Sequence, residues 1–209
     1  DNAPNNLLFN IYDGEKENLV EFLKLNEIAV QPLFPVTSAR FQRLDSKKEI
    51  DRTFNFTWMD KLPEGNEVIA GKWFENENNG ISISSEISER YELQVNDQIV
   101  IDIAGKKISS YIQSIREVNW ENFSPNFFAI GFPDDFKEIS STFITSFHIP
   151  QEKKPLSSEL MKTFPTISFI SLDAIILEVQ SIISKVSQAL KLILGLTLIA
   201  GLFLMLATI

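Results

Sequence analysis

The sequence has no cysteine among its 209 residues and a single histidine, His148. The lack of cysteine excludes disulfide bonds, thiolate nucleophiles and zinc sites with cysteine ligands. The histidine falls in a segment of alternating polar and apolar residues, and we interpret it as the end of a strand. A metal site would need carboxylates alone. Asp134 and Asp135 fit the first turn of a helix better than a calcium site, so we expect neither metal nor cofactor.

Positive charge is scarce, because 19 Lys and Arg stand against 28 Asp and Glu, for a formal charge of −9. A protein that binds nucleic acid needs a basic face for the phosphates. The nearest feature to a basic cluster is Lys106 and Lys107, which fit the solvated tip of a hairpin. We therefore expect no nucleic-acid partner.

Catalytic motifs are also missing, since GxSxG, HExxH and GxxxxGKS/T do not occur. Residues 70–73, AGKW, lack the upstream glycine and the Ser or Thr of a phosphate loop. A serine hydrolase would need a base, and only His148 is present. The sequence predicts a protein that is not an enzyme, and a membrane-tethered hydrolase is the least favoured alternative.

The N-terminus has neither the basic region nor the long apolar run of a signal peptide. At the other end, the residues from Leu192 to Ile209 carry no charge, and about 20 apolar residues cross a bilayer as a helix. A buried core helix is the alternative, but it would show a polar stripe, and only Thr197 and Thr208 are polar here. We expect residues 192–209 to begin a transmembrane helix and the chain to be a fragment of a longer exported protein.

The segment before this run carries a helical repeat. Ile175, Val179, Ile182 and Val186 recur at spacings of four and three, as in a heptad seam that packs against another helix. The opposite face is polar, no proline or glycine interrupts it, and Asp173 suits a helix start. We expect one stiff helix of about 55 Å, whose first half forms a stalk in water.

Three small residues, Thr197, Ala200 and Gly201, lie on one side of the expected membrane helix. Small residues let neighbouring helices approach closely. A plain anchor needs neither these residues nor an unbroken stalk, and it usually follows a flexible linker. We therefore expect residues 173–191 to be a stalk and residues 192–209 to pack within a bundle.

The rest of the chain predicts two interleaved parts. A strand, a helix and an extended segment at the start are matched by strands and a helix near the end, so we expect an α+β sandwich lobe over residues 1–45 and 120–172. The expected strands are at 7–12, 30–44, 126–132, 142–149 and 166–171, and the expected helices at 15–26 and 156–164.

A small β-rich lobe is expected as an insert over residues 46–119. It holds a strand, a short helix over residues 85–93, and a hairpin with strands at 98–103 and 107–118. Ala104 and Gly105 form the turn of this hairpin, and a second tight turn is expected at Asn96 and Asp97.

One long segment carries a resemblance to a known family. The residues GISISSEISERYELQVNDQIVIDIAGKKISSYIQSIREVNW resemble the signature of extracytoplasmic domains in the FtsX/MacB-type ABC transporter permease superfamily, with Asn96 where that family usually has glycine. FNFTWMDKLPEGNEVIAGKWF, REVNWENFSPNFFAIGF and FPTISFISLDAIILEVQSIISKVSQAL resemble its YbbP-like branch. These segments follow one another in the same order along nearly the whole chain.

The resemblance implies a second periplasmic domain of a permease subunit in a bacterial inner membrane, with its soluble part facing the periplasm. It implies a porter-like lobe with a small inserted lobe, a separate cytoplasmic ATP-binding cassette subunit, and further transmembrane helices in the same permease. Members of the superfamily often act on lipids or other hydrophobic molecules at the outer face of the membrane. The YbbP-like branch is also linked to a periplasmic esterase or lysophospholipase partner.

We therefore expect a domain that couples ATP hydrolysis by a partner subunit to movement or extraction of a lipid-like substrate. The alternative is a tail-anchored periplasmic binding or scaffold domain with no transport role. Trp73, Phe74 and Trp120 are candidates for contact with hydrophobic cargo, and for each of them the alternative is core packing.

Overall fold

A computed structural model describes the backbone of residues 4–43, 50, 52–75, 80–120 and 125–207; the side chains of residues 43, 198–200 and 202–207 are not among those described. The described chain divides into two compact units, Asp1–Ile170 and Ser171–Ile209. Each unit is considered by itself below. The first is mixed α and β, which confirms the expected α+β class.

Four strands form one part of the first unit, in the order β10-β1-β9-β2. They are β1 (Asn6–Ile11), β2 (Phe34–Arg43), β9 (Thr142–Phe147) and β10 (Ser168–Ser171). Strands β1 and β2 both pair antiparallel with β9, so the two ends of the chain meet in one sheet. The strands expected at 7–12, 142–149 and 166–171 are confirmed.

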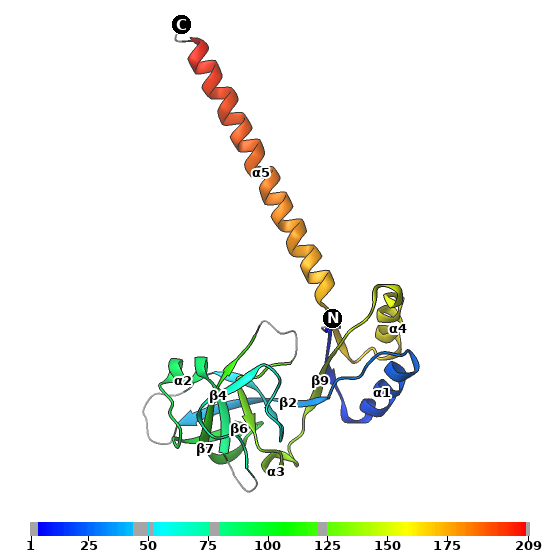
Figure 1. Cartoon of the computed structure of the whole chain (residues 1–209), viewed down its shortest axis with the longest axis vertical. Helices are drawn as coiled ribbons and strands as arrows, with labels where there is room; N and C mark the ends of the chain where they lie inside the picture. The colour runs from blue at the N-terminus through cyan, green and yellow to red at the C-terminus, as the bar shows by residue number, and fades with distance from the viewer. Residues whose placement is uncertain (1–3, 44–49, 51, 76–79, 121–124, 208–209) are drawn as a thin grey trace. The chain divides into compact units, whose positions relative to one another are not determined.

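Two helices, α1 (Lys16–Leu25) and α4 (Pro155–Thr163), lie on the same side of β9 (Figure 1). Both were expected from their apolar spacing. Leu19 and Leu23 of α1 and Leu160 of α4 are buried with Leu8 of β1 and Phe147 of β9 in one hydrophobic cluster. This cluster is therefore the core of a two-layer sandwich of helices on a sheet.

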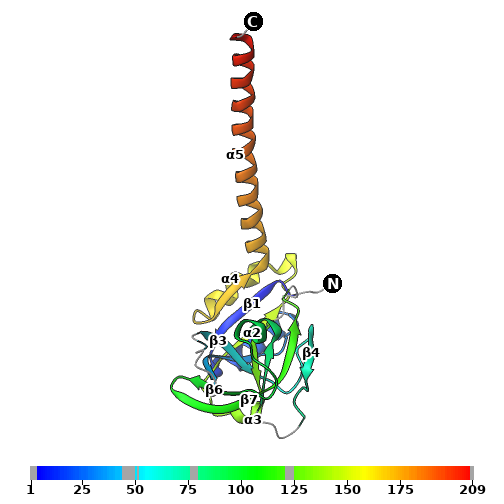
Figure 2. The ribbon, with the colours of Figure 1, turned by 90° about the vertical axis from the view of Figure 1, so that its left-hand side faces the viewer.

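Six strands of the described chain pair in a closed ring. Three of them, β3, β6 and β7, are labelled in Figure 2. Around the ring, β2 pairs with β3, β3 with β8, β8 with β5, β5 with β7, β7 with β6, and β6 again with β2. The strands other than β2 are β3 (Thr53–Trp58), β5 (Gly80–Ser84), β6 (Gln98–Ile103), β7 (Lys106–Val118) and β8 (Ala129–Gly131). Strand β4 (Asn66–Gly71) pairs with β7 outside the ring.

The ring encloses a second core, in which Phe41, Phe56, Ile83 and Ile101 are buried together with other aromatic and branched side chains. Such an interior is filled by side chains and leaves no channel, as in other small barrels. Strands β2 and β8 come from outside residues 46–119, so the ring draws on both expected lobes. The division into an outer lobe and an insert stays a prediction.

The hairpin of β6 and β7 is confirmed at the expected residues. Its turn residues Ala104 and Gly105 have φ of 51° and 87°, and Asn96 has φ of 74°. Asn96 tolerates this left-handed conformation, which explains how it can stand where the resembling family has glycine. The short helices of the first unit are α2 (Ser85–Tyr91), α3 (Pro133–Phe136), η1 (Asp13–Glu15) and η2 (Gln151–Lys153).

The second unit is one helix, α5 (Leu172–Ala207), which contains 36 residues (Figure 1). The side chain of Ser171 accepts a hydrogen bond from the backbone nitrogen of Ala174 at 3.4 Å, at the expected helix start. Among the described residues, no helix has the length and apolar character needed to span a membrane. The transmembrane assignment of residues 192–209 is therefore not confirmed.

Candidate functional site

An uncharged groove lies on the face of the β10-β1-β9-β2 sheet that is opposite to its helices. Alternation along the strands turns Leu8 and Phe147 toward the helices, while Leu7 and Ile144 line the groove. The groove has a volume of about 730 Å³, and none of its lining residues is Asp, Glu, Lys, Arg or His. Its apolar lining residues are Leu7, Phe9, Val36, Phe143, Ile144 and Ile170, among others. The lining therefore combines apolar groups with hydroxyl and amide groups and contains no charged side chain.

Trp73 and Phe74, two of the expected contact residues, lie together. Their ring centroids are 4.5 Å apart, and both pack against a cluster formed by Met59, Phe127 and Ile130. The indole nitrogen of Trp73 donates a hydrogen bond of 2.8 Å to the backbone oxygen of Asp60. The pair therefore packs against the segment that follows β3, and its contact with cargo stays a prediction.

Trp120, the third expected contact residue, is 43% exposed. Its indole nitrogen donates to a carboxylate oxygen of Glu86 at 2.5 Å, and its ring centroid is 4.7 Å from that of Phe128. Burial acts to raise the pKa of Glu86. The hydrogen bond from Trp120, further hydrogen bonds to the carboxylate and the charge of Arg116 outweigh burial, and they hold this pKa below its usual range. Trp120 is thus partly exposed, while its indole nitrogen is held by Glu86.

Arg116 is a buried charge that the sequence analysis did not identify. It is fully buried on β7, where its two terminal nitrogens donate to the side-chain oxygen of Asn66 and the backbone oxygen of Phe127, each at 2.6 Å. Within the described part of the chain its Nε atom has no partner. Burial lowers the pKa of Arg116 to about 9, although the charge of Glu86 opposes this effect.

The hydrogen bonds of Arg116 continue into a chain of amides. Asn66 donates to the side-chain oxygen of Asn126 at 3.1 Å, and Asn126 donates to the backbone oxygen of Asn119 at 2.9 Å. The network fixes β4, β7 and the segment that leads into β8. A signal for it was present, because Arg116 shares its strand phase with the buried Ile112 and Val118.

Two features of the described residues are open to contact, the uncharged groove and the partly exposed Trp120. In the described ranges, no three His, Asp or Glu side chains gather closely enough to hold a metal ion. The polar side chains that do converge, Arg116 with Asn66 and Trp120 with Glu86, are bound to one another. Contact of Trp120 with a hydrophobic cargo stays a prediction.

The chain was compared with protein families, curated proteins and solved structures. No model of a protein family matches the chain. A curated protein from Escherichia coli strain K12, described as the uncharacterized ABC transporter permease YbbP, is 27% identical over an alignment of 215 residues that covers 99% of this chain and 26% of that protein. Along nearly its whole length, the chain is similar to one part of an ABC transporter permease. The expected YbbP-like resemblance is confirmed.

A solved structure also matches this chain. It is the crystal structure of a domain assigned to a permease protein from Porphyromonas gingivalis, with 15% identity, a TM-score of 0.40, and coverage of 80% of this chain and 82% of that one. The chain spans about a quarter of the length of the curated relative it matches. The similarity therefore concerns one part of a longer permease.

The remaining predicted residues lie on α5. Ile175, Val179, Ile182 and Val186 are each about half exposed in the isolated helix, and Asp173 lies in its first turn. A seam is shown only when a second helix packs against it. The role of these residues in transmission therefore stays a prediction.

The residues expected to pack inside the membrane lie farther along α5. The Thr197 hydroxyl donates to the backbone oxygen of Leu194 at 2.8 Å, a bond within the helix. A Cβ atom at Gly201 would meet no other atom within 4 Å. The Ala200 side chain is outside the described residues. Packing at these positions also stays a prediction.

Proposed function

We propose that the chain is an extracytoplasmic domain of an ABC transporter permease subunit in a bacterial inner membrane, with its soluble part facing the periplasm. The observation that carries the proposal is the match of 99% of this chain to 26% of a permease. If the chain is one domain of such a transporter, its role is part of the transport that the whole protein carries out. The tail-anchored scaffold gains no support from this match, because the relative is a permease.

The proposed energy source is the separate cytoplasmic ATP-binding cassette subunit that the resemblance implies, and such a subunit would account for the lack of a phosphate loop in this chain. The uncharged run from Leu192 to Ile209 is proposed to enter the bilayer and to pack there with the remaining transmembrane helices of the same permease. Thr197, Ala200 and Gly201 would permit that packing. A periplasmic esterase or lysophospholipase partner is retained from the resemblance alone.

The proposed mechanism is transmission of movement along α5. The helix extends from Leu172 to Ala207, and the segment of 173–194 contains neither glycine nor proline, the usual causes of a kink. A continuous helix resists bending, so closure of the ATPase subunits would move its periplasmic end. The seam of Ile175, Val179 and Ile182 would bind a second helix and so stiffen the stalk.

The proposed cargo is lipid-like or otherwise hydrophobic, and the uncharged groove is the surface that suits it best. Its half-buried Leu7, Phe9 and Ile144 would gain from contact with an apolar group, at about 25 cal/mol for each Å² removed from water. Trp120 is the expected contact residue that keeps the most exposed ring. Trp73 and Phe74 would act by supporting the segment after β3.

Transmission is tested by softening α5 without changing its length. Ser181, Ser184 and Gln188 lie on its exposed polar face and are replaced together by glycine, or by alanine in the matched control. Each glycine weakens a helix by about 1 kcal/mol relative to alanine. In the full transporter in proteoliposomes, we expect the glycine variant to hydrolyse ATP but to extract a fluorescent lysophospholipid poorly, while the alanine variant keeps both activities. Equal extraction by the two variants would refute rigid transmission.

A further inference from the structure

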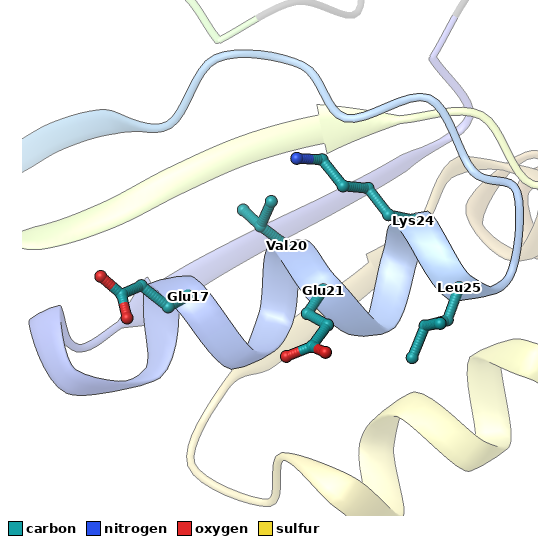
Figure 3. Close-up of a pocket in the computed structure, with 5 residues that line it drawn as sticks. All are labelled: Glu17, Val20, Glu21, Lys24 and Leu25. Atoms are coloured by element: carbon teal, nitrogen blue, oxygen red, sulfur yellow. The ribbon is translucent and has the colours of Figure 1, made fainter.

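Among the described residues of the first unit, Leu25 has the most exposed large apolar side chain, at 77%. It ends α1 and lines two neighbouring hollows, one of about 440 Å³ along α1 and one of about 370 Å³ between the end of α1 and the start of α4. Figure 3 shows Leu25 and Glu21 extending to the same side of α1. The side chain of Leu25 is thus exposed to solvent where the two hollows meet.

The surroundings of Leu25 are acidic. Glu17 and Glu21 line the first hollow, and Glu152 and Glu159 line the second. We call Leu25 and these four glutamates the α1–α4 patch. All four glutamates are exposed, and the structure shows no ion pair for them within the described residues.

The lysines beside the patch do not neutralise it. Lys153 is already engaged, because its ammonium group donates to the Glu27 carboxylate at 2.9 Å and to the backbone oxygen of Asn26 at 2.8 Å. The hydrogen bond and charge of Lys153 hold the pKa of Glu27 below its usual range. Of the charged residues that line the two hollows, five are glutamates and two, Lys24 and Lys153, are lysines. The lining around Leu25 therefore carries more negative than positive charge.

The groove and the α1–α4 patch differ in this respect. The groove on the open face of the sheet has no charged lining residue, whereas carboxylates surround the exposed leucine on the surface of the helices. A general excess of acid over the chain would not produce this contrast. The negative field also disfavours the membrane surface as the occupant, because the phosphate groups of lipids are negative and like charges repel.

We propose that the α1–α4 patch docks a protein partner that presents an apolar side chain flanked by lysine or arginine. The apolar side chain would cover Leu25 and the flanking cations would lie against the glutamates, an arrangement typical of interfaces with an apolar centre and a charged rim. This docking does not depend on the proposed transport function. It would hold for a scaffold domain as well.

The test uses the full permease in its native membrane, with a photo-cross-linking amino acid in place of Lys24. We expect one cross-linked protein, attached through a segment in which an apolar residue is flanked by Lys or Arg, as mapped by mass spectrometry. Leu25→Ser should reduce the yield about tenfold, since it removes the burial of a leucine. The double variant E17Q/E21Q should also reduce it, and more strongly at low salt, where charge is screened least.

Ile69→Ser is the matched control, because Ile69 is 54% exposed on β4 and lines neither hollow. It should leave the yield unchanged, and ATP hydrolysis should be the same in all variants. The proposal is overturned if no product forms, if the product is a phospholipid, if the attached segment lacks Lys and Arg, or if Leu25→Ser leaves the yield intact.

Discussion

At the scale of single residues, Gly131 lies where two aromatic rings leave no room for a side chain. A Cβ atom there would come within 2.7 Å of Phe56 and closer still to Phe136, and both rings are buried in the core of the ring of strands. Gly131→Ala should lower the free energy of unfolding by about 1–3 kcal/mol, the usual cost of overpacking. Gly14→Ala is the control in the same denaturant titration, because a Cβ at Gly14 meets nothing within 4 Å. Equal midpoints for the two variants would contradict this account.

Arg116 donates hydrogen bonds to two oxygen atoms, one on Asn66 and one on Phe127. Arg116→Met would remove the cost of burying a guanidinium, but it would leave the Phe127 and Asn66 oxygens without their donor, at about 1–3 kcal/mol for each orphaned acceptor. The second effect should win, and we expect a net loss of about 1–3 kcal/mol. Thermal unfolding measures it, with Arg90→Met as the exposed control. A stabilised Arg116→Met would show that the charge is a net burden.

The indole of Trp120 lowers the pKa of Glu86 by donating to its carboxylate. Trp120→Phe should therefore raise this pKa, because burial, which acts in the opposite direction, would be less opposed. A carboxyl with a lowered pKa stabilises the fold above its usual pKa and loses that effect as pH falls through the folded value. The variant should lose part of this stabilisation. Carboxyl NMR titration measures the shift, and Trp73→Phe, which does not contact Glu86, should leave it unchanged.

At the scale of elements, the turn of the β6–β7 hairpin holds an alanine in a strained conformation. Ala104 and Gly105 both have positive φ, as a two-residue type I′ turn requires, and asparagine is preferred over alanine at the first position. Ala104→Asn should raise the free energy of unfolding by roughly 0.5–1 kcal/mol. Ala104→Val, which is branched at Cβ, should lower it. Chemical denaturation of the two variants would contradict the argument if their order were reversed.

The elements that could be predicted from sequence are those defined by local patterns. Alternation and turn residues gave β6 and β7, and apolar spacing gave α1, α4 and α5. Strands β3 and β4 were not identified. The closed ring could not be predicted either, because its parallel pairs, β3 with β8 and β5 with β7, join segments far apart in sequence.

The candidate site was predictable to a smaller extent. Aromatic residues can be named from the sequence, but whether Trp73 faces water or Met59 depends on the tertiary packing. The uncharged groove follows from which face of the sheet the helices cover, and that choice has no local signature. Arg116 was the missed residue with a usable signal, its inward strand phase.

At the scale of the whole molecule, β2 joins the two cores of the first unit. Its residues 34–36 pair with β9 in the sandwich, and residues 37–43 pair with β3 and β6 in the ring. Since neither core can lose β2 without damaging the other, residues 1–170 alone should unfold in a single transition. Near-ultraviolet circular dichroism and tryptophan fluorescence should give the same midpoint. Two separated midpoints would mean that the cores are independent domains.

The closed ring of strands has a consequence for self-association. A strand edge with free backbone groups can template the addition of another chain, and in the ring each strand has a neighbour on both sides. Among the described strands, the sheet ends only at β10 and β4. Losing β6 would open the ring at β2 and β7 together, and two fresh edges would then be available to neighbouring copies. Local unfolding of this hairpin would therefore allow copies of the chain to polymerise through the edges of β2 and β7.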